Sequence, residues 1–387
     1  MDIRDETIRF DPPETKRKKI LFSILGIIVF CVIGVVVVNV YHRVSGTPSV
    51  PVGSQPTPTP DPMAPKQVLL LGYGGINHDG GLLTDTMIVA RIVPKEKKVI
   101  LISIPRDLWV PVEVNVGTSS GFKINAVYAI GSDDKAYPNK PKQYQGDNGG
   151  IRMAKDAVGK VTGLTIDWAV AIDFSGFTKL MNTLGGIFVD VPFSFEDTLY
   201  PLEGKEKEPC GKSEEDIQKT MATLSGQLLE EQFPCRYETL KFEKGKQFMD
   251  GVTALKFVRS RHSNVNGGDF GRSLRQQAFI QGVKNRVLSF SGATKIISLV
   301  QDGLKMVDTD ITVQDVSRMV ELYGNISSYT FDSIPLTDQT VLEFSMSPDG
   351  QSILVPKAGV DDWQSISQYI KEESLRITEA TPSGVVQ

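Results

Sequence analysis

The chain has 387 residues, of which 40% are hydrophobic and 23% charged, and its formal net charge is −4. This length allows a sizeable core and two or three domains, and the composition is that of a globular protein rather than a disordered one. The slightly acidic balance argues against nucleic acid as a partner, because binding to a phosphate backbone requires an excess of positive charge. Any basic site must therefore be local.

Residues 20–40 form an uncharged apolar run of about 21 residues, which at ~1.5 Å per residue would cross a ~30 Å hydrocarbon layer. Basic residues 16–19 precede this run, whereas only His42 and Arg43 follow it closely. This asymmetry predicts a single-pass protein in the cell membrane, with residues 1–19 as a cytoplasmic tail and the rest of the chain outside. A cleaved signal peptide is the alternative, but no small-x-small cleavage site follows the run.

Residues 41–65 are rich in proline and predict a semi-rigid linker between the membrane and a globular domain. The domain should span residues 66–377, with a polar insertion at about residues 200–243 and a short tail over residues 378–387. Short β-branched runs that alternate with helical patterns predict an α/β fold with a central sheet. We expect strands at residues 67–72, 86–92, 98–105, 168–174, 188–193 and 352–356, and helices at residues 150–161, 175–184, 247–257, 270–288, 313–322 and 361–370.

Two of the three cysteines, Cys210 and Cys235, flank the polar insertion, while Cys31 lies in the apolar run. Outside the cytoplasm, a Cys210–Cys235 disulfide would close the insertion into a loop. Two unpaired thiols on an exposed loop are the alternative, and the sequence leaves both open.

The most informative segment is residues 256–275, which contains Arg259, Arg261, Arg272 and Arg275 but a single acid, Asp269. In an extended backbone Arg259 and Arg261 would project to the same side. Several guanidinium groups that converge suit a diphosphate, because each can bind phosphate oxygens in a bidentate way. A solvated face with surface ion pairs is the alternative, but it leaves the missing counter-charges unexplained.

A helix over this segment would place Arg272, Arg275 and Gln276 on one face, since they are spaced i, i+3 and i+4. Asp269 would then stand at the start of that helix, where backbone N–H groups and the helix dipole favour anions. Asp269 is therefore a candidate for catalysis and also for an N-cap, and both roles are compatible.

Two carboxylates, Asp79 and Asp85, lie in a glycine-rich stretch after the first predicted strand. Beside an arginine cluster they suggest Mg²⁺, which usually takes one or two carboxylates together with phosphate oxygens. The alternative is that Asp79 is a turn residue and that Asp85 only begins a strand. Arg106 at the end of another predicted strand, and Lys123 further along, are additional candidates for the site.

The succession LLLG…TDTM, LISIPRDLWV, FKINAVY, ALKFVRSRH and GDFGRSLRQQ resembles the LytR-CpsA-Psr family of cell-wall phosphotransferases over about residues 66–288. The resemblance implies a central mixed β-sheet flanked by helices, with a hydrophobic tunnel for a polyprenyl tail. It also implies one N-terminal transmembrane helix and a domain outside the cytoplasm.

The resemblance also implies roles for individual residues. Asp85 would be one of two Mg²⁺ carboxylates, and Asp269 would orient or deprotonate the acceptor hydroxyl. In place of the family's other carboxylate, this chain has Tyr73, and Asp79 is the candidate substitute. The pyrophosphate-binding set would comprise Arg106, Lys123, Arg259, Arg261, Arg272, Arg275 and Gln276, with Arg259 and Arg261 also acting in catalysis.

The implied reaction transfers a glycopolymer phosphate from a polyprenyl-pyrophosphate carrier to peptidoglycan, at the C6 hydroxyl of N-acetylmuramic acid. The implied partners are the lipid-linked glycan, the peptidoglycan acceptor and the membrane. A polyprenyl-pyrophosphate pyrophosphatase with water as acceptor and a non-catalytic envelope protein that binds lipid or glycan remain as alternatives. A transcriptional regulator fits less well, because the domain is expected outside the membrane.

Overall fold

The computed structural model describes residues 61–75, 78, 80–265, 267–289, 302–323 and 328–379. The predicted cytoplasmic tail and membrane segment, most of the linker, Asp79 and residues 380–387 lie outside these ranges. Within these ranges, no helix combines the length and the apolar character needed to cross a membrane.

A six-stranded mixed sheet forms the centre of the molecule, with the strand order β11-β6-β1-β2-β3-β12. β1 runs parallel to β6 and antiparallel to β2, and β3 runs antiparallel to β2 and parallel to β12. The strands are β1 (Lys66–Tyr73), β2 (Thr84–Val93), β3 (Lys98–Ser103), β6 (Trp168–Asp173), β11 (Asp308–Thr309) and β12 (Thr330–Pro335). The predicted α/β fold with a central mixed sheet is thereby confirmed.

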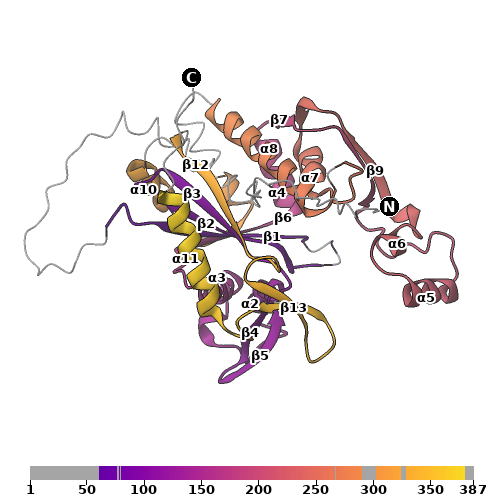
Figure 1. Cartoon of the computed structure of the whole chain (residues 1–387), viewed down its shortest axis with the longest axis horizontal. Coiled ribbons are helices and arrows are strands. Elements are labelled where there is room, and N and C mark those ends of the chain that lie inside the picture. The colour runs from indigo at the N-terminus through magenta and orange to yellow at the C-terminus, as the bar shows by residue number, and fades with distance from the viewer. Residues whose placement is uncertain are drawn as a thin grey trace, which may run out of the picture.

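Helices cover both faces of this sheet, and two separate apolar cores result (Figure 1). β1 is apolar along its length because Val68 and Leu70 face one core while Leu69 and Leu71 face the other. One core is covered by α4 (Phe174–Thr183), α7 (Gly251–Arg259), α8 (Gly268–Leu288) and α10 (Val313–Tyr323). The other is covered by α2 (Val127–Ser132), α3 (Gly149–Thr162) and α11 (Trp363–Glu379).

Four two-stranded sheets surround the centre. They comprise β4 (Trp109–Asn115) with β5 (Thr118–Lys123), β7 (Ile187–Val191) with β10 (Gly245–Met249), β8 (Phe195–Pro201) with β9 (Tyr237–Phe242), and β13 (Leu342–Met346) with β14 (Ser352–Pro356). Short 3-10 helices are η1 (Ile124–Ala126), η2 (Lys142–Tyr144) and η3 (Pro234–Arg236). The insertion between β8 and β9 carries α5 (Glu214–Thr223) and α6 (Gln227–Glu230), and it extends from the body as an arm (Figure 1).

The prediction of a helix over residues 247–257 is wrong at its beginning. Residues 247–249 belong to β10, where Phe248 lies opposite Phe188 of β7. Only at Asp250 does the chain turn into α7, because the Asp250 carboxylate accepts a hydrogen bond from the Thr253 amide at 2.8 Å and caps the helix.

The Asp250 cap leads to a prediction for stability. The hydrogen bond from the Thr253 backbone lowers the pKa of Asp250, so its stabilising effect is present above its unfolded pKa and is lost as the pH falls through the folded pKa. Asp250→Ala should cost about 1 kcal/mol of unfolding free energy at neutral pH. In chemical denaturation, this difference should shrink below about pH 4. Asp250→Asn, which keeps an acceptor, should stay near wild type; equal losses in both variants would contradict the cap.

Candidate active site

The candidate site lies at one edge of the central sheet, where several strands end. β1, β3 and β6 run in the same direction, and antiparallel β2 begins at the edge where they end, so that Thr84 lies opposite Tyr73. Ligands of open α/β sheets commonly bind outside the carboxyl ends of the strands. Most of the candidate residues that the sequence predicts come from the loops and helix ends around this edge.

Four charged side chains alternate in sign at this edge. Arg106 Nη1 donates to Asp85 Oδ1 at 2.6 Å, and Arg106 Nε lies 3.6 Å from Asp107 Oδ2. Lys123 Nζ donates to Asp107 Oδ1 at 2.7 Å. Partial burial lowers the pKa of Arg106, but the hydrogen bond and the charge of Asp85 more than offset this and the pKa is raised overall. Arg106 is therefore a permanent cation that remains about half exposed, at 47%.

Local structure brings these residues together. Asp85 stands at the start of β2, and Arg106 follows the end of β3 directly. Lys123 is the last residue of β5, which pairs with β4 and returns the chain to the same edge. The hydroxyl of Thr84 donates to Asn125 O at 3.2 Å and holds the segment after Lys123 against the start of β2. The structure thus brings together Asp85, Arg106 and Lys123, which the sequence placed in separate motifs.

Arg259, at the end of α7, is held by two aromatic side chains. Its guanidinium carbon lies 3.9 Å from the ring centroid of Phe174, and Nη1 donates to the Tyr200 hydroxyl at 3.1 Å. Burial raises the pKa of Tyr200, so this hydroxyl stays neutral and accepts the hydrogen bond. A guanidinium stacked on a ring keeps its other N–H groups available, and the stack fixes its plane.

Phe174 also connects Arg259 to the glycine-rich loop between β1 and β2. The His78 ring packs edge-on against Phe174, with 5.3 Å between the ring centroids. Phe174 begins α4 immediately after Asp173, the last residue of β6, whose carboxylate caps α4 by accepting from the Gly176 amide at 2.6 Å. The two cationic groups, Arg259 on one side and Arg106 with Lys123 on the other, therefore flank the same edge of the sheet.

The segment that carries Arg261 leaves α7 at Ser260 and is fixed by the buried Asp197 of β8. Asp197 Oδ2 accepts from the Ser260 hydroxyl at 2.6 Å and from the amides of Arg261 and His262 at 3.0 and 3.1 Å. Ser263 forms an isolated β-bridge with Asp197. Arg261 itself is exposed.

Arg275 lies beneath this segment rather than at the surface. It is fully buried, its guanidinium donates to Ser260 O and to Ser263 Oγ, and its guanidinium carbon lies 4.6 Å from the Phe195 ring centroid. Gln276 is likewise buried. The predicted helical face of residues 272–276 is present in α8, but at Arg275 it is turned toward the protein. The position of Arg275 supports a structural role in holding the loop.

Three other candidate site residues are Asp269, Arg272 and Asp79. Arg272 lies in the predicted helix, whereas Asp269, expected just before the helix as an N-cap, lies inside it because α8 begins at Gly268. The described part of each residue is its backbone. Asp79 lies outside the described residues.

Tyr73, at the position where the family resemblance implies a carboxylate, ends β1 beside Asp173. Its ring lies 5.3 Å from that of Tyr128, and the Tyr128 hydroxyl donates to Asp308 Oδ2 at 2.8 Å. Burial raises the pKa of both tyrosines, and nearby aspartates raise it further. Tyr73 is therefore a neutral side chain at this edge and does not replace a carboxylate.

Magnesium in proteins is commonly held by one or two carboxylates together with phosphate oxygens and water. Asp85 is a half-exposed carboxylate in the cationic cluster and fits the first role. Among the residues that the structure describes, no group of three or more His, Cys, Asp or Glu side chains is placed to hold a metal ion.

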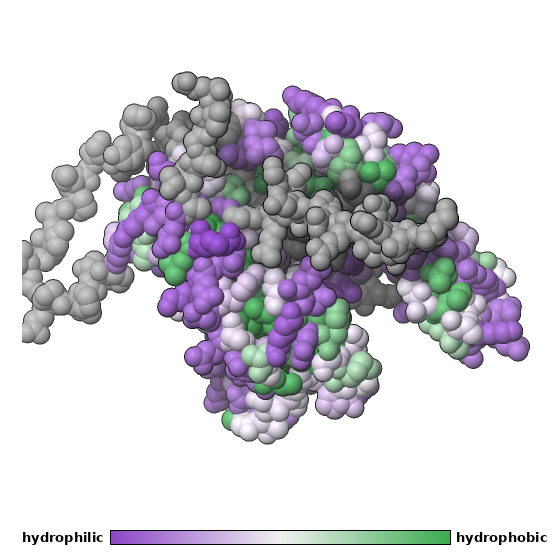
Figure 2. Space-filling view, in the orientation of Figure 1, coloured by the Kyte–Doolittle hydropathy of each residue, from purple (hydrophilic) through white to green (hydrophobic). Residues whose placement is uncertain are grey.

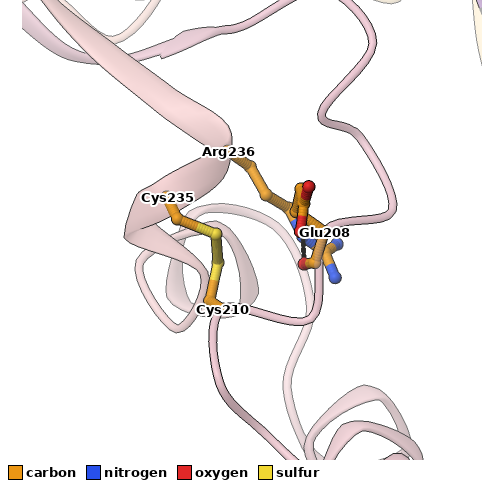
Figure 3. The surroundings of a disulfide bond; sticks show 4 residues. All are labelled: Glu208, Cys210, Cys235 and Arg236. Atoms are coloured by element: carbon orange, nitrogen blue, oxygen red, sulfur yellow. Dashed lines mark hydrogen bonds between the residues drawn. A yellow bond between two sulfur atoms is a disulfide. The ribbon is translucent and has the colours of Figure 1, made fainter.

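The insertion is closed by the Cys210–Cys235 disulfide (Figure 3). It also touches the loop that follows α7. Arg236 packs over the buried Phe233 ring at 3.8 Å and donates to Glu208 O at 2.7 Å beside the disulfide. Glu230 Oε2 of α6 lies 3.1 Å from His262 Nε2. Of the two thiol states that the sequence left open, the structure has the disulfide.

Little apolar burial stabilises this insertion. α5 has no buried residue, and Met221 and Leu228 are each 61% exposed. Figure 2 shows hydrophobic residues on the surface of the arm beside hydrophilic ones. A small unit with so little core depends on a cross-link for its shape.

The disulfide should therefore control local opening of the insertion. It joins residues 25 positions apart, for which the chain-entropy model gives a stabilisation of about 3.5 kcal/mol. The double variant Cys210→Ser, Cys235→Ser should be cut faster by a protease within residues 202–236, as mapped by mass spectrometry. Wild-type chain treated with a reductant serves as the matched control and should show the same cleavage sites. Unchanged cleavage in both samples would contradict this role.

Three residues that hold the site were not predicted from the sequence: Asp197, Phe174 and Tyr200. Phe174 lies at the end of a predicted strand and reads as ordinary core, whereas Tyr200 lies where the polar insertion was expected to begin. Asp197 lies between Glu196 and Thr198 in a stretch without a recognisable motif or a predicted strand. No signal in the sequence distinguished it from the acid beside it.

The fold and the site together define an α/β protein with a cationic site at the carboxyl edge of a mixed sheet. The chain belongs to the LytR-CpsA-Psr family: the LytR_cpsA_psr family model matches residues 42–359. The resemblance noted from the sequence motifs is thereby confirmed.

Curated relatives carry names of cell-wall transferases. The polyisoprenyl-teichoic acid–peptidoglycan teichoic acid transferase TagV of Bacillus subtilis (strain 168) is 28% identical over 254 residues, which are 66% of this chain and 51% of TagV. The transferase of the same description named TagU, from Halalkalibacterium halodurans, is 27% identical over 67% of this chain and 65% of its own length. The chain thus spans about half to two thirds of these two relatives. TagU of Bacillus mycoides (strain KBAB4) is 27% identical over 80% of this chain and 84% of its own length.

Solved structures share the fold. The crystal structure of B. subtilis TagV has a TM-score of 0.52 and 24% identity, covering 83% of this chain and 99% of that structure. Protein gbs0355 from Streptococcus agalactiae has a TM-score of 0.53 and 20% identity, covering 84% of this chain and 91% of that structure.

Proposed function

We propose that this chain transfers a phosphate-linked glycopolymer from a polyprenyl-pyrophosphate carrier to peptidoglycan. The observation that carries the proposal is the placement of Arg259, Arg106 and Lys123 around one edge of the sheet, with Arg261 on a fixed loop. Family membership and the names of TagV and TagU support the choice of donor and acceptor.

The cationic residues suit a pyrophosphate for a physical reason. A diphosphate carries several charged oxygens, and guanidinium groups bind such oxygens with two parallel hydrogen bonds. Arg259 is held flat against Phe174, and the backbone of Arg261 is fixed by Asp197. An oriented guanidinium at Arg259 and a fixed backbone at Arg261 reduce the freedom that is lost when the donor binds, which favours tight and specific binding.

In the reaction, the C6 hydroxyl of N-acetylmuramic acid attacks the phosphorus next to the glycan. A new P–O bond forms, the P–O bond to the bridging oxygen breaks, and polyprenyl phosphate leaves with the electron pair. The proton of the attacking hydroxyl passes to a base, for which Asp269 at the start of α8 is the candidate. Arg259, Arg261 and Arg106 stabilise charge on the phosphate oxygens, so catalysis rests mainly on positioning and electrostatics.

Mg²⁺ is the cofactor that we propose, with Asp85 as one ligand and Asp79 as the second candidate. When bound, this ion would neutralise phosphate charge and polarise the phosphoryl group. Arg272 and Gln276 belong to the proposed donor-binding set by family resemblance, and Arg275 supports that set from beneath.

The remaining proposals concern the surroundings of the domain. Residues 20–40 would anchor the chain in the membrane, with residues 1–19 in the cytoplasm and residues 41–65 as the linker to the domain at residues 66–377. The polyprenyl tail would enter a hydrophobic tunnel between the sheet and its helices. Nucleic acid is not a proposed partner.

A substitution at Arg261 tests this proposal. Removing a group that stabilises the transition state typically lowers kcat by about 100- to 1000-fold, and we expect a loss of this size for Arg261→Ala. The measurement is the rate of conjugate formation by full-length chain in detergent, with Mg²⁺, a short-chain prenyl-pyrophosphate saccharide and peptidoglycan oligomers, followed by mass spectrometry. Arg318→Ala, an exposed arginine on α10, is the matched control and should keep the wild-type rate.

The products distinguish the possible functions. A glycan joined to peptidoglycan through one phosphate, and lost with EDTA, supports the transferase. Prenyl phosphate released without a conjugate would contradict it in favour of a pyrophosphatase. A lipid that binds but stays unreacted would instead indicate a binding protein.

A further inference from the structure

Asp197 is an ionisable side chain with no exposed surface, and its known contacts all lead to one loop or its own strand. Three donors reach Oδ2, namely the Ser260 hydroxyl and the amides of Arg261 and His262, and the Leu199 amide reaches Oδ1 at 3.1 Å. A buried carboxylate is costly unless it is fully hydrogen-bonded. The carboxylate of Asp197 is satisfied by residues 260–262, which lie between α7 and α8, and by Leu199 of its own strand.

The backbone of residues 260–262 needs a hydrogen-bond acceptor from outside α7. Ser260 leaves α7 with φ −50° and ψ 132°, so the chain turns from helical to extended directly after Arg259. The amides of Arg261 and His262 then have no helical partner, and Asp197 accepts from both. The direction in which Arg261 leaves the helix, relative to Arg259, is therefore set by this carboxylate.

A buried cation binds the same loop. The guanidinium of Arg275 donates to Ser260 O and, at 3.0 Å, to Ser263 Oγ, while Asp197 accepts from the Ser260 hydroxyl and from the next two amides. The loop is thus bonded to a buried anion from β8 and to a buried cation from α8. Such contacts cost more to break than surface contacts, since removing one partner leaves a buried charge uncompensated.

We propose that Asp197 is a positioning residue of the phosphate site, which fixes Arg261 relative to Arg259 before the donor binds. The inference rests on the proposed function, because it assigns Asp197 a role in binding a prenyl pyrophosphate. This role differs from general stabilisation of the fold, because Asp197 would affect ligand binding through Arg261. Removing Asp197 should therefore remove most of what Arg261 contributes to binding.

A double-mutant cycle separates these roles. Full-length chain in detergent is titrated with geranyl pyrophosphate and Mg²⁺ by calorimetry, for wild type, Asp197→Asn, Arg261→Ala and the double variant. Asp197→Asn should weaken binding about tenfold to a hundredfold, the range for a hydrogen bond to a charged group. Arg261→Ala should weaken binding clearly less in the Asp197→Asn background than in wild type.

Two further variants guard the experiment against loss of the fold. Ser260→Ala removes one donor to Asp197 and leaves the carboxylate and both amides in place, so it should give a smaller loss of the same kind. Asp190→Asn, an exposed aspartate on β7, should bind like wild type. Thermal unfolding of each variant reports whether the body of the protein is intact.

The outcomes distinguish the inference from the proposed function. If Arg261→Ala weakens binding by the same factor with and without Asp197→Asn, the two residues act independently. This result would overturn the positioning role and leave Asp197 as a structural residue, with the proposed function intact. A wild-type chain that fails to bind geranyl pyrophosphate would contradict the proposed function, and the positioning role with it. A clearly reduced Arg261 effect in the Asp197→Asn background, with a smaller loss of binding in Ser260→Ala and with every variant folded, is the result that we expect.

Discussion

The hydrogen bonds between Asp197 and the loop after α7 connect the scaffold to the cationic site. β8 is part of a peripheral hairpin, α7 and α8 cover one face of the central sheet, and Asp197 and Arg275 join these elements at a single loop. Arg259 precedes this loop and Arg261 lies within it. The direction in which Arg261 departs from Arg259 therefore depends on a contact between segments that are 63 and 64 residues apart in sequence.

The direction of the strands explains why the other half of the site lies nearby. Because β1, β3 and β6 end at one edge, the loops that carry His78, Arg106 and Phe174 meet there. Asp85 reaches the same edge because β2 runs in the opposite direction. The two apolar cores hold the sheet rigid from both faces, and polar residues are left to the strand ends.

The insertion adds a third contact to the arginine loop through Glu230 and His262. It has little core, and a disulfide closes it. Because it lies outside the central sheet and touches the arginine loop, a change in the insertion can alter the surroundings of Arg261 without disturbing the sheet.

Much of this could be predicted from the sequence, and the exceptions have physical causes. The apolar runs of β1, β2, β3 and β6 identified the central strands, and residues 352–356 were predicted with the observed bounds of β14. The helix predicted over residues 247–257 begins only after Asp250, because the pairing of β10 with β7 is non-local and outweighs local helix propensity at residues 247–249. The burial of Asp197 and Arg275 was not predictable, since each is satisfied by partners distant in sequence. Spacing placed Arg275 on a helical face but could not say toward which side that face turns.

The most direct test of the account is a crystal structure of the full chain with geranyl pyrophosphate and Mg²⁺. The account predicts diphosphate oxygens within hydrogen-bond distance of the guanidinium groups of Arg259 and Arg261, at the edge that carries Arg106. It also predicts that the loop keeps its hydrogen bonds to Asp197. A diphosphate bound elsewhere, or a loop that must leave Asp197 to reach it, would contradict a site that is arranged before its ligand arrives.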